Sequence, residues 1–184
     1  MAGTTRMTST VLTGASTAPF PSVGELNEVS VAAFLEAAAL LFEPAPRFGA
    51  WLAAARPFAD DADLMKAAAR IAHHMDVADQ VELINAHPRL GARDRLSDAS
   101  RREQGADADP LDAALAELNG AYEARFGFRY LVYVAGRPRG ALLPEFRAAL
   151  ERDRADELRR ALDDTLAIAA NRLHFFRNTL GSPP

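Results

Sequence analysis

The chain contains no cysteine in its 184 residues. Disulfides, thiolate nucleophiles and cysteine-ligated zinc or iron–sulfur centres are therefore excluded. Long apolar runs are also missing, because no stretch approaches the roughly 18 consecutive apolar residues that a membrane span needs. A basic surplus is absent as well: the formal net charge is -4, and charges of both signs alternate through the second half. The sequence therefore predicts a protein whose partners include neither nucleic acid nor a membrane.

Charge is scarce at the N-terminus, where Arg6 is the only charged side chain before Glu25. Residues 1–24 are rich in Thr, Ser, Ala, Gly and Pro, which offers too little apolar surface to offset the entropy of ordering. The segment also lacks the continuous apolar stretch of a secretory signal. We expect a disordered tail over residues 1–24 and, since the length suits one domain, a single helical domain over residues 25–180. The C-terminus lacks a Ser-Lys-Leu address, so a cytoplasmic location is expected.

Apolar residues recur at three- and four-residue spacing through most of the chain, which predicts amphipathic helices. The first helix is expected from about Val29 to Glu43, where Pro44 stops it. Its apolar stripe consists of Val31, Phe34, Leu35, Ala38, Leu41 and Phe42. Further helices are expected around residues 48–52, 61–75, 77–86, 97–105, 110–126, 144–152 and 155–176.

One stretch lacks a helical period. Residues 128–135 read Phe-Arg-Tyr-Leu-Val-Tyr-Val-Ala, a composition that is rich in aromatic and β-branched residues. Because no second strand candidate can pair with them, an extended segment buried among helices is expected. Its backbone amides then need partners, and a bound ligand is one candidate. The predicted fold is all-α: a single-domain bundle of about eight helices with one extended segment at about 128–135.

Among the four histidines, His87 is best placed for chemistry. Pro88 must end a helix there, and an imidazole with its ordinary pKa can give or take a proton at physiological pH. A plainer interpretation is that a histidine at a helix C-terminus interacts favourably with the helix dipole. His73 and His74 could join His87 in a metal-dependent hydrolase, but the sequence does not supply further ligands at matching helical positions.

A second group of polar side chains follows His87. Ser100, Glu103 and Gln104 share one face of a short predicted helix, so they can converge on one ligand. Ser-x-x-Glu is also a capping box, in which the hydroxyl and the carboxylate satisfy amides at a helix start. Both interpretations remain open, although a capping box does not need Gln104. Arg172 interrupts the apolar end of the last helix, and its guanidinium could bind a carboxylate through a bidentate fork.

Several motifs, in order, resemble those of the OHCU decarboxylase family (2-oxo-4-hydroxy-4-carboxy-5-ureidoimidazoline decarboxylase). They are His87-Pro88-Arg89-Leu90-Gly91, Ser100-x-x-Glu103-Gln104 and Leu118-Asn119-x-x-Tyr122-x-x-Arg125-Phe126-Gly127-Phe128. Further matches are Leu26-Asn27, Phe34, Phe42-Glu43, Arg56-Pro57-Phe58 and Asn171-Arg172-Leu173. Each motif alone is weak, whereas their order over about Leu26 to Leu173 is specific.

The resemblance implies an all-α enzyme of urate breakdown that decarboxylates OHCU to (S)-allantoin without a metal or an organic cofactor. It implies His87 as the main catalytic residue and Glu103 as a second catalytic residue, with Pro88 shaping the pocket wall. We expect the carboxylate of Glu103 to set the protonation state of His87. The implied substrate contacts are Pro88, Ser100, Gln104, Leu131, Val134, Ala135 and Arg172. The resemblance leaves open a homodimer and action beside a urate oxidase and a hydroxyisourate hydrolase.

Three features depart from the family pattern. The loop from His87 to Ser100 is shorter than in animal members, Arg129 replaces the usual proline, and Arg89 stands where an aspartate is common. The first two are expected to shift the pocket rim, and none of the three removes a catalytic group. Besides the metal hydrolase, the remaining alternative is a non-catalytic helical module that binds a ureide or a purine in the same pocket.

Overall fold

The computed structural model describes residues 20–91 and 110–179, which form eight α-helices and one short 3-10 helix. The helices are α1 (Val23–Glu28), α2 (Val31–Phe42), α3 (Pro46–Ala54), α4 (Asp61–His74), α5 (Val77–Asn85), α7 (Pro110–Phe126), η1 (Arg139–Leu142), α8 (Leu143–Ala149) and α9 (Arg154–Thr179). No strand occurs in these two ranges, so the predicted all-α fold is confirmed. The helix predicted at 97–105 lies outside the described residues.

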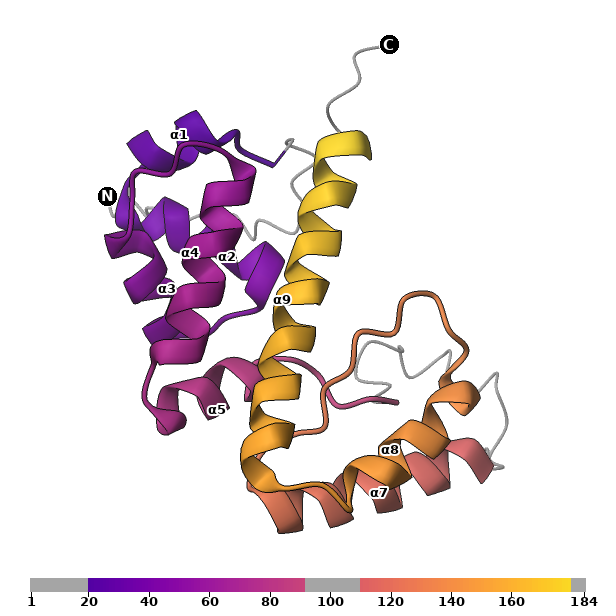
Figure 1. Cartoon of the computed structure of the whole chain (residues 1–184). Helices are drawn as coiled ribbons and strands as arrows, with labels where there is room; N and C mark the ends of the chain where they lie inside the picture. The colour runs from indigo at the N-terminus through magenta and orange to yellow at the C-terminus, as the bar shows by residue number, and fades with distance from the viewer. Residues whose placement is uncertain (1–19, 92–109, 180–184) are drawn as a thin grey trace, which may run out of the picture.

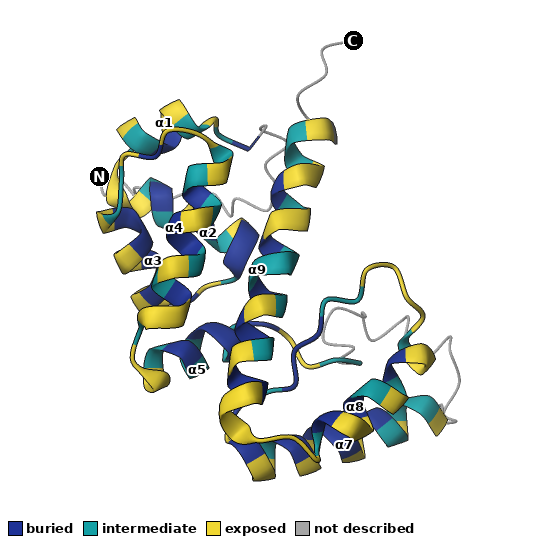
Figure 2. Ribbon diagram, viewed as in Figure 1, coloured by how far each residue is buried: buried dark blue, intermediate teal, exposed yellow. Residues whose placement is uncertain are grey.

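The long helix α9 organises the fold (Figure 1). Helices α2, α4 and α5 pack against it, whereas α7 and α8 pack against each other beside its N-terminal end (Figure 1). Buried apolar residues recur along α9 at helical spacing, and these are Leu158, Ala161, Leu162, Ala169 and Leu173. Figure 2 shows dark blue buried segments along α9 that alternate with yellow exposed ones. None of the helices in the described ranges is long and apolar enough to cross a membrane.

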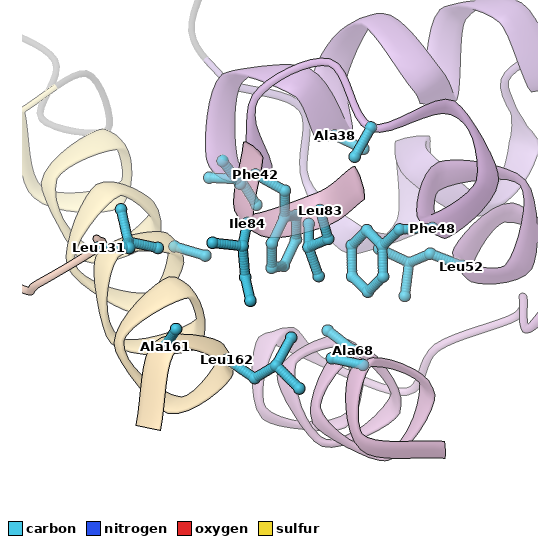
Figure 3. Close-up of a cluster of buried hydrophobic side chains, with 14 of the residues drawn as sticks. Ala38, Phe42, Phe48, Leu52, Ala68, Leu83, Ile84, Leu131, Ala161 and Leu162 are labelled. Atoms are coloured by element: carbon cyan, nitrogen blue, oxygen red, sulfur yellow. The ribbon is translucent and has the colours of Figure 1, made fainter. Parts of the chain in front are cut away.

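The main core gathers side chains from helices that are far apart in the sequence (Figure 3). Phe42, Phe48, Leu52, Leu83, Ile84 and Leu162 are all buried there. Two of them, Leu83 and Ile84, belong to the last turn of α5, and neither has any exposed surface. The C-terminal end of α5 is therefore fixed by core packing, and so is the start of the segment that follows it. Val31, expected in the buried stripe of α2, is instead 53% exposed because it opens the helix.

Residues 20–24 belong to the described structure, although they fall within the tail predicted over residues 1–24. Helix α1 starts at Val23, and Ser22 and Glu25 form a capping box at its start. The side chain of Phe20 is buried, and its ring stacks on Phe176 with centroids 5.2 Å apart. Composition did not reveal this helix because it is only six residues long and buries one of them, Leu26. Residues 1–19 lie outside the described residues.

The extended segment is present where the sequence predicts it. Residues 127–138 link α7 to η1 without forming a helix or a strand. The segment is held by buried aromatic rings, because Tyr130 stacks on Phe146 with centroids 3.7 Å apart and meets Tyr122 edge-on at 5.2 Å. These contacts fix the segment against α7 and α8, so it can serve as one wall of a site.

Candidate active site

His87 lies directly after α5 with only 2% of its surface exposed. Its backbone amide donates a hydrogen bond to the carbonyl of Ile84 at 3.2 Å, which extends the last turn of the helix. Because Leu83 and Ile84 anchor that turn in the core, the imidazole is carried into the interior. The sequence predicted a ring facing a cleft at the helix end, and the structure shows that this ring is almost completely shielded from water.

The two ring nitrogens of His87 have different surroundings. Nδ1 lies 3.3 Å from the carbonyl oxygen of Leu83. A carbonyl oxygen can only accept a hydrogen bond, so this contact assigns the proton of the neutral ring to Nδ1. Nε2 is buried and has no hydrogen-bond partner among the described residues. Buried polar atoms are seldom left unpaired, so Nε2 is available to accept a proton or a hydrogen bond from a ligand.

The pKa of His87 lies below its ordinary value. Burial is the main cause, since it disfavours the charged ring. The positive charge of Arg172 lowers the pKa further, whereas the carbonyl of Leu83 and the carboxylate of Glu43 oppose the shift. The lowered pKa favours the neutral imidazole near pH 7, which is the form that can act as a base.

Arg172 reaches the same region from α9. Its Nη2 lies 2.6 Å from Oε1 of Glu43, and its Nη1 donates to the carbonyl of Leu41 at 3.0 Å. Glu43 ends α2 with a positive φ of 61°, a conformation that costs a non-glycine residue about 1–3 kcal/mol. A carboxylate is also unfavourable at a helix C-terminus. These two costs indicate that Glu43 serves to orient Arg172.

A cavity of about 600 Å³ is lined by the second half of the extended segment and by α9. Its lining residues are Val132, Tyr133, Val134, Ala135, Gly136, Ile168, Asn171 and Arg172. The structure thus brings together three of the predicted substrate contacts, Val134, Ala135 and Arg172. Arg172 also links the cavity to His87, because it lines the one and acts electrostatically on the other. The volume is within the usual range for small-molecule sites.

Ala135 adopts a positive φ of 50° and is followed by Gly136 with a φ of 74°. Non-glycine residues with a positive φ are uncommon and tend to occur at functional sites. Glu43 and Ala135 are the two that the described ranges contain. One orients an arginine of the cavity and the other forms part of its wall, so both strained positions belong to the same site.

The remaining predicted residues are placed differently. The side chain of Leu131 is buried in the main core (Figure 3), and it is not among the residues that line the cavity. Pro88 is exposed on the surface directly after His87. Ser100, Glu103 and Gln104 lie outside the described residues. Their roles therefore stay predictions of the sequence.

Protein groups supply several of the partners that the extended segment needs. The carbonyl of Leu131 accepts a hydrogen bond from Arg160 at 2.9 Å. The carbonyls of Tyr133 and Val134 accept hydrogen bonds from Arg137 at 2.9 and 3.1 Å. These bonds satisfy carbonyls of the segment, so a bound ligand as a partner of its backbone amides stays a prediction. The segment still forms the wall of the cavity.

The other histidines do not join His87 in a common site. Nε2 of His73 lies 3.0 Å from Asp163 on the protein surface, and Nδ1 of His74 lies 2.7 Å from the carbonyl of Arg70. Within residues 20–91 and 110–179, no three His, Cys, Asp or Glu side chains are grouped so that they could hold a metal ion. These ranges therefore contain no set of ligands for the metal-dependent hydrolase that the sequence left as an alternative.

The sequence did not reveal the roles of two residues near His87. Glu43 pairs with Arg172, and Arg129 binds the backbone at the C-terminal end of α5. A local signal exists for Glu43, because an acid at a helix end directly before a proline is unfavourable to the helix and calls for another explanation. For Arg129 the signal was its departure from the family pattern. Neither signal identifies the partner, since each contact joins residues that are far apart in the chain.

The fold and the site define a small helical protein with a buried imidazole and a cavity lined by Arg172, whose charge acts on that imidazole. A model of the OHCU decarboxylase family matches residues 27–174, and this chain belongs to that family. The resemblance drawn from the ordered motifs is thereby confirmed.

Proteins from other organisms are similar to this chain in sequence. The chain is 30% identical over 154 residues to 2-oxo-4-hydroxy-4-carboxy-5-ureidoimidazoline decarboxylase of Haloferax volcanii, which covers 81% of this chain and 92% of the relative. It is 32% identical over 157 residues to the uric acid degradation bifunctional protein PucL of Bacillus subtilis, covering 83% of this chain but only 32% of that longer protein.

Solved structures share the fold at lower identity. A structure of OHCU decarboxylase in the presence of (S)-allantoin superimposes with a TM-score of 0.58 at 20% identity, covering 75% of this chain and 93% of that chain. A crystal structure of (S)-allantoin synthase gives a TM-score of 0.62 at 21% identity, covering 85% of this chain and 54% of that chain. These two similarities support the helical architecture.

Proposed function

We propose that this protein decarboxylates OHCU to (S)-allantoin in urate breakdown, with His87 as the main catalytic residue and without a metal or an organic cofactor. The observation that carries the proposal is the buried Nε2 of His87, which has no hydrogen-bond partner among the described residues of a chain that belongs to this family. The names of the relatives support the reaction, and that of PucL supports its setting in uric acid degradation.

The chemistry of the substrate suits this arrangement. Loss of CO2 leaves an electron pair on the ring, where the adjacent nitrogens and carbonyl can delocalise it, so a cofactor is not needed as an electron sink. The protein must orient the carboxylate, stabilise the developing charge and deliver a proton to one face of the ring. We assign proton transfer to His87: neutral Nε2 accepts the proton of the substrate hydroxyl, and the imidazolium returns a proton to the neighbouring ring carbon.

The cavity supplies the proposed substrate contacts. Arg172, oriented by its ion pair with Glu43, places a guanidinium at the cavity wall that can bind an anionic group of the substrate. Backbone groups near Val134 and Ala135 are proposed to meet the ureido-imidazoline ring. We retain Pro88 and Leu131 as contacts proposed from the resemblance, although Leu131 faces the core.

The polar residues that follow His87 in the sequence are also assigned roles in the proposed reaction. Glu103 is proposed to set the protonation state of His87, with Ser100 and Gln104 as substrate contacts. Action beside a urate oxidase and a hydroxyisourate hydrolase, a cytoplasmic location and a homodimer likewise remain proposals.

The test is the rate of (S)-allantoin formation, followed by circular dichroism after OHCU is freshly generated. Replacing His87 with Asn should lower kcat by about 10²- to 10⁴-fold, the usual contribution of general acid–base catalysis, while the far-ultraviolet spectrum stays unchanged. The matched control is His73→Asn, which alters a surface histidine of α4 and should keep the wild-type rate.

Two outcomes would contradict the proposal. A folded His87→Asn variant with the full rate would remove His87 from the mechanism. A wild-type protein that binds allantoin but does not accelerate OHCU decay would favour the non-catalytic binding module.

A further inference from the structure

The segment that carries His87 is held by one arginine of the extended segment. The backbone amide of Arg129 donates to Oδ1 of Asn85 at 2.9 Å. Its Nη1 donates to the carbonyl of Asn85 at 2.7 Å and to the carbonyl of His87 at 2.8 Å. Three hydrogen bonds therefore join two segments that are more than 40 residues apart in the sequence.

These bonds satisfy backbone carbonyls that have no hydrogen-bond partner within the helix. The last four carbonyls of an α-helix have no partner within the helix, and a positive charge near them is favourable because it opposes the negative end of the helix dipole. Hydrogen bonds from a guanidinium are also stronger than those between neutral groups. The guanidinium of Arg129 thus binds two backbone carbonyls at the C-terminal end of α5, and one of them belongs to His87 itself.

A second arginine anchors the chain on the other side of Pro88. Nε and Nη2 of Arg89 each lie 2.6 Å from an oxygen of Glu123, which belongs to α7. The pKa of Glu123 is lowered, mainly by its hydrogen bond with Arg89 and also by the charge of Arg129. The backbone that presents His87 is therefore fixed before the proline by Arg129 and after it by the bond to α7.

We propose that Arg129 is a positioning residue for the reaction: by holding the carbonyls of Asn85 and His87, it sets the direction of Nε2 relative to the cavity. The inference rests on the proposed role of His87 as the catalytic base. The imidazole itself has only one hydrogen bond among the described residues, the contact of 3.3 Å with Leu83. Its direction thus depends on the backbone that carries it.

Three substitutions of Arg129 remove different sets of its hydrogen bonds. Arg129→Met keeps an aliphatic stem of similar length but removes the donors to both carbonyls. Arg129→Lys returns an ammonium group that can donate to the same two carbonyls. Arg129→Pro removes the backbone amide as well as the guanidinium. Arg159→Met is the matched control, because Arg159 is exposed on α9 and pairs only with Asp156 in the described contacts.

We expect kcat of Arg129→Met to fall roughly 10- to 100-fold, since a displacement of about 1 Å can cost up to 10²-fold in rate. KM should change much less, because the cavity contacts remain. Arg129→Lys should recover most of the rate, Arg129→Pro should lose more than Arg129→Met, and Arg159→Met should match the wild type. Asn85→Ala, which removes one bond from the other partner, should lower kcat by a smaller factor.

A second measurement does not depend on turnover. Titration of the His87 ring by NMR, assigned by the signal that His87→Asn lacks, reports the pKa of the imidazole. Arg172 on α9, Glu43 at the end of α2 and the carbonyl of Leu83 act on the ring, and all three remain in the variants. If the backbone after α5 is held less tightly, water should reach the His87 ring. The pKa of the ring should then rise toward the ordinary value in Arg129→Met and Asn85→Ala but stay unchanged in Arg159→Met.

The results distinguish this inference from the proposed function. Variants of Arg129 and Asn85 that stay folded with wild-type kcat and an unmoved pKa of His87 would overturn the positioning role. Loss of rate in Arg129→Met that Arg129→Lys does not restore would also count against it. A wild-type protein without activity toward OHCU would instead refute the proposed function, while the NMR titration would still decide whether Arg129 controls the environment of His87.

Discussion

At the scale of single residues, His87 owes its proposed role to burial. A histidine at an exposed helix C-terminus would be stabilised as a cation by the helix dipole. The structure places the ring in the interior beside Arg172, and its pKa is lowered instead. The sequence could indicate the residue but not its charge, since the sign of the shift depends on the surroundings that folding creates.

The lowered pKa of His87 predicts a pH dependence. A neutral base works only above its pKa, so kcat/KM should be constant near neutrality and should fall about tenfold per pH unit once the pH drops below that pKa. Because burial lowers the pKa, the fall should begin below the ordinary value of about 6.5. The measurement is a pH–rate profile of (S)-allantoin formation. A rate that increases as the pH falls through this range would show that the cationic ring is the active form.

Arg129 shows what a departure from a family pattern can mean. Its replacement of proline suggested a shifted pocket rim, and that effect stays a prediction. The contacts give the residue a definite place, because its guanidinium and amide bind the exit of α5. A proline could form none of these three bonds, since it has neither a donor side chain nor a backbone N–H.

At the scale of elements, the extended segment depends on a buried ionic network. Glu157 of α9 has no exposed surface and accepts hydrogen bonds from Tyr122 at 2.7 Å, from Arg152 at 2.8 Å and from Arg160 at 2.8 Å. Burial raises the pKa of Glu157, but its hydrogen bonds outweigh that effect and hold the pKa below the ordinary value. Arg160 in turn donates to Leu131, which ties the segment to α9.

Glu157→Gln should therefore destabilise the fold strongly. The change removes the negative charge that faces two arginines, and loss of one partner of a buried ion pair typically costs 3–5 kcal/mol. We expect about 3 kcal/mol, because the side chain of Arg152 remains partly exposed to water. The measurement is urea unfolding followed by circular dichroism.

The adjacent residue provides the control for this experiment. Asp156→Asn alters an ion pair with Arg159 whose two side chains are both more than 60% exposed, and such pairs contribute at most about 1 kcal/mol. Equal small losses in the two variants would show that the network around Glu157 does not hold the segment.

At the scale of the whole molecule, the two ends of the helical domain are joined. Arg177, in the last turns of α9, donates to the carbonyl of Phe20 at 3.0 Å and forms a fork with Asp61 at 2.9 Å. The ring of Phe20 stacks on Phe176. The structured domain thus includes residues that composition assigns to a tail, because their partners lie about 155 positions away in the chain.

Two truncations test this boundary. A chain that begins at Phe20 should keep the thermal midpoint of the full chain, as expected if the tail before it is disordered. A chain that begins at Glu25 loses a buried aromatic ring and the cap of α1, and a buried Phe alone typically contributes about 3–5 kcal/mol. Thermal unfolding of the three chains should show a clear drop only for the shortest. Equal midpoints in all three would place the boundary at residue 24 after all.

The sequence by itself determined the helices and the family. Helical periodicity and the prolines that stop helices are local properties of the chain, so α2, α4, α5 and α9 fall close to their predicted ranges. The ordered motifs indicated the family without any knowledge of the fold. The short helix α1, which composition did not reveal, depends on the burial of Phe20 and Leu26 in a core formed by distant residues.

Only the tertiary structure decided the state of the site. Burial lowers the pKa of His87. The ion pair of Arg172 with Glu43 and the hydrogen bond of Arg129 to the carbonyl of His87 join residues that are about 40 to 130 positions apart. Burial and ion pairing depend on which surfaces meet, and no local pattern records that. Ser100, Glu103 and Gln104 are still known from their motif alone, whereas His87 is defined by both its motif and its surroundings.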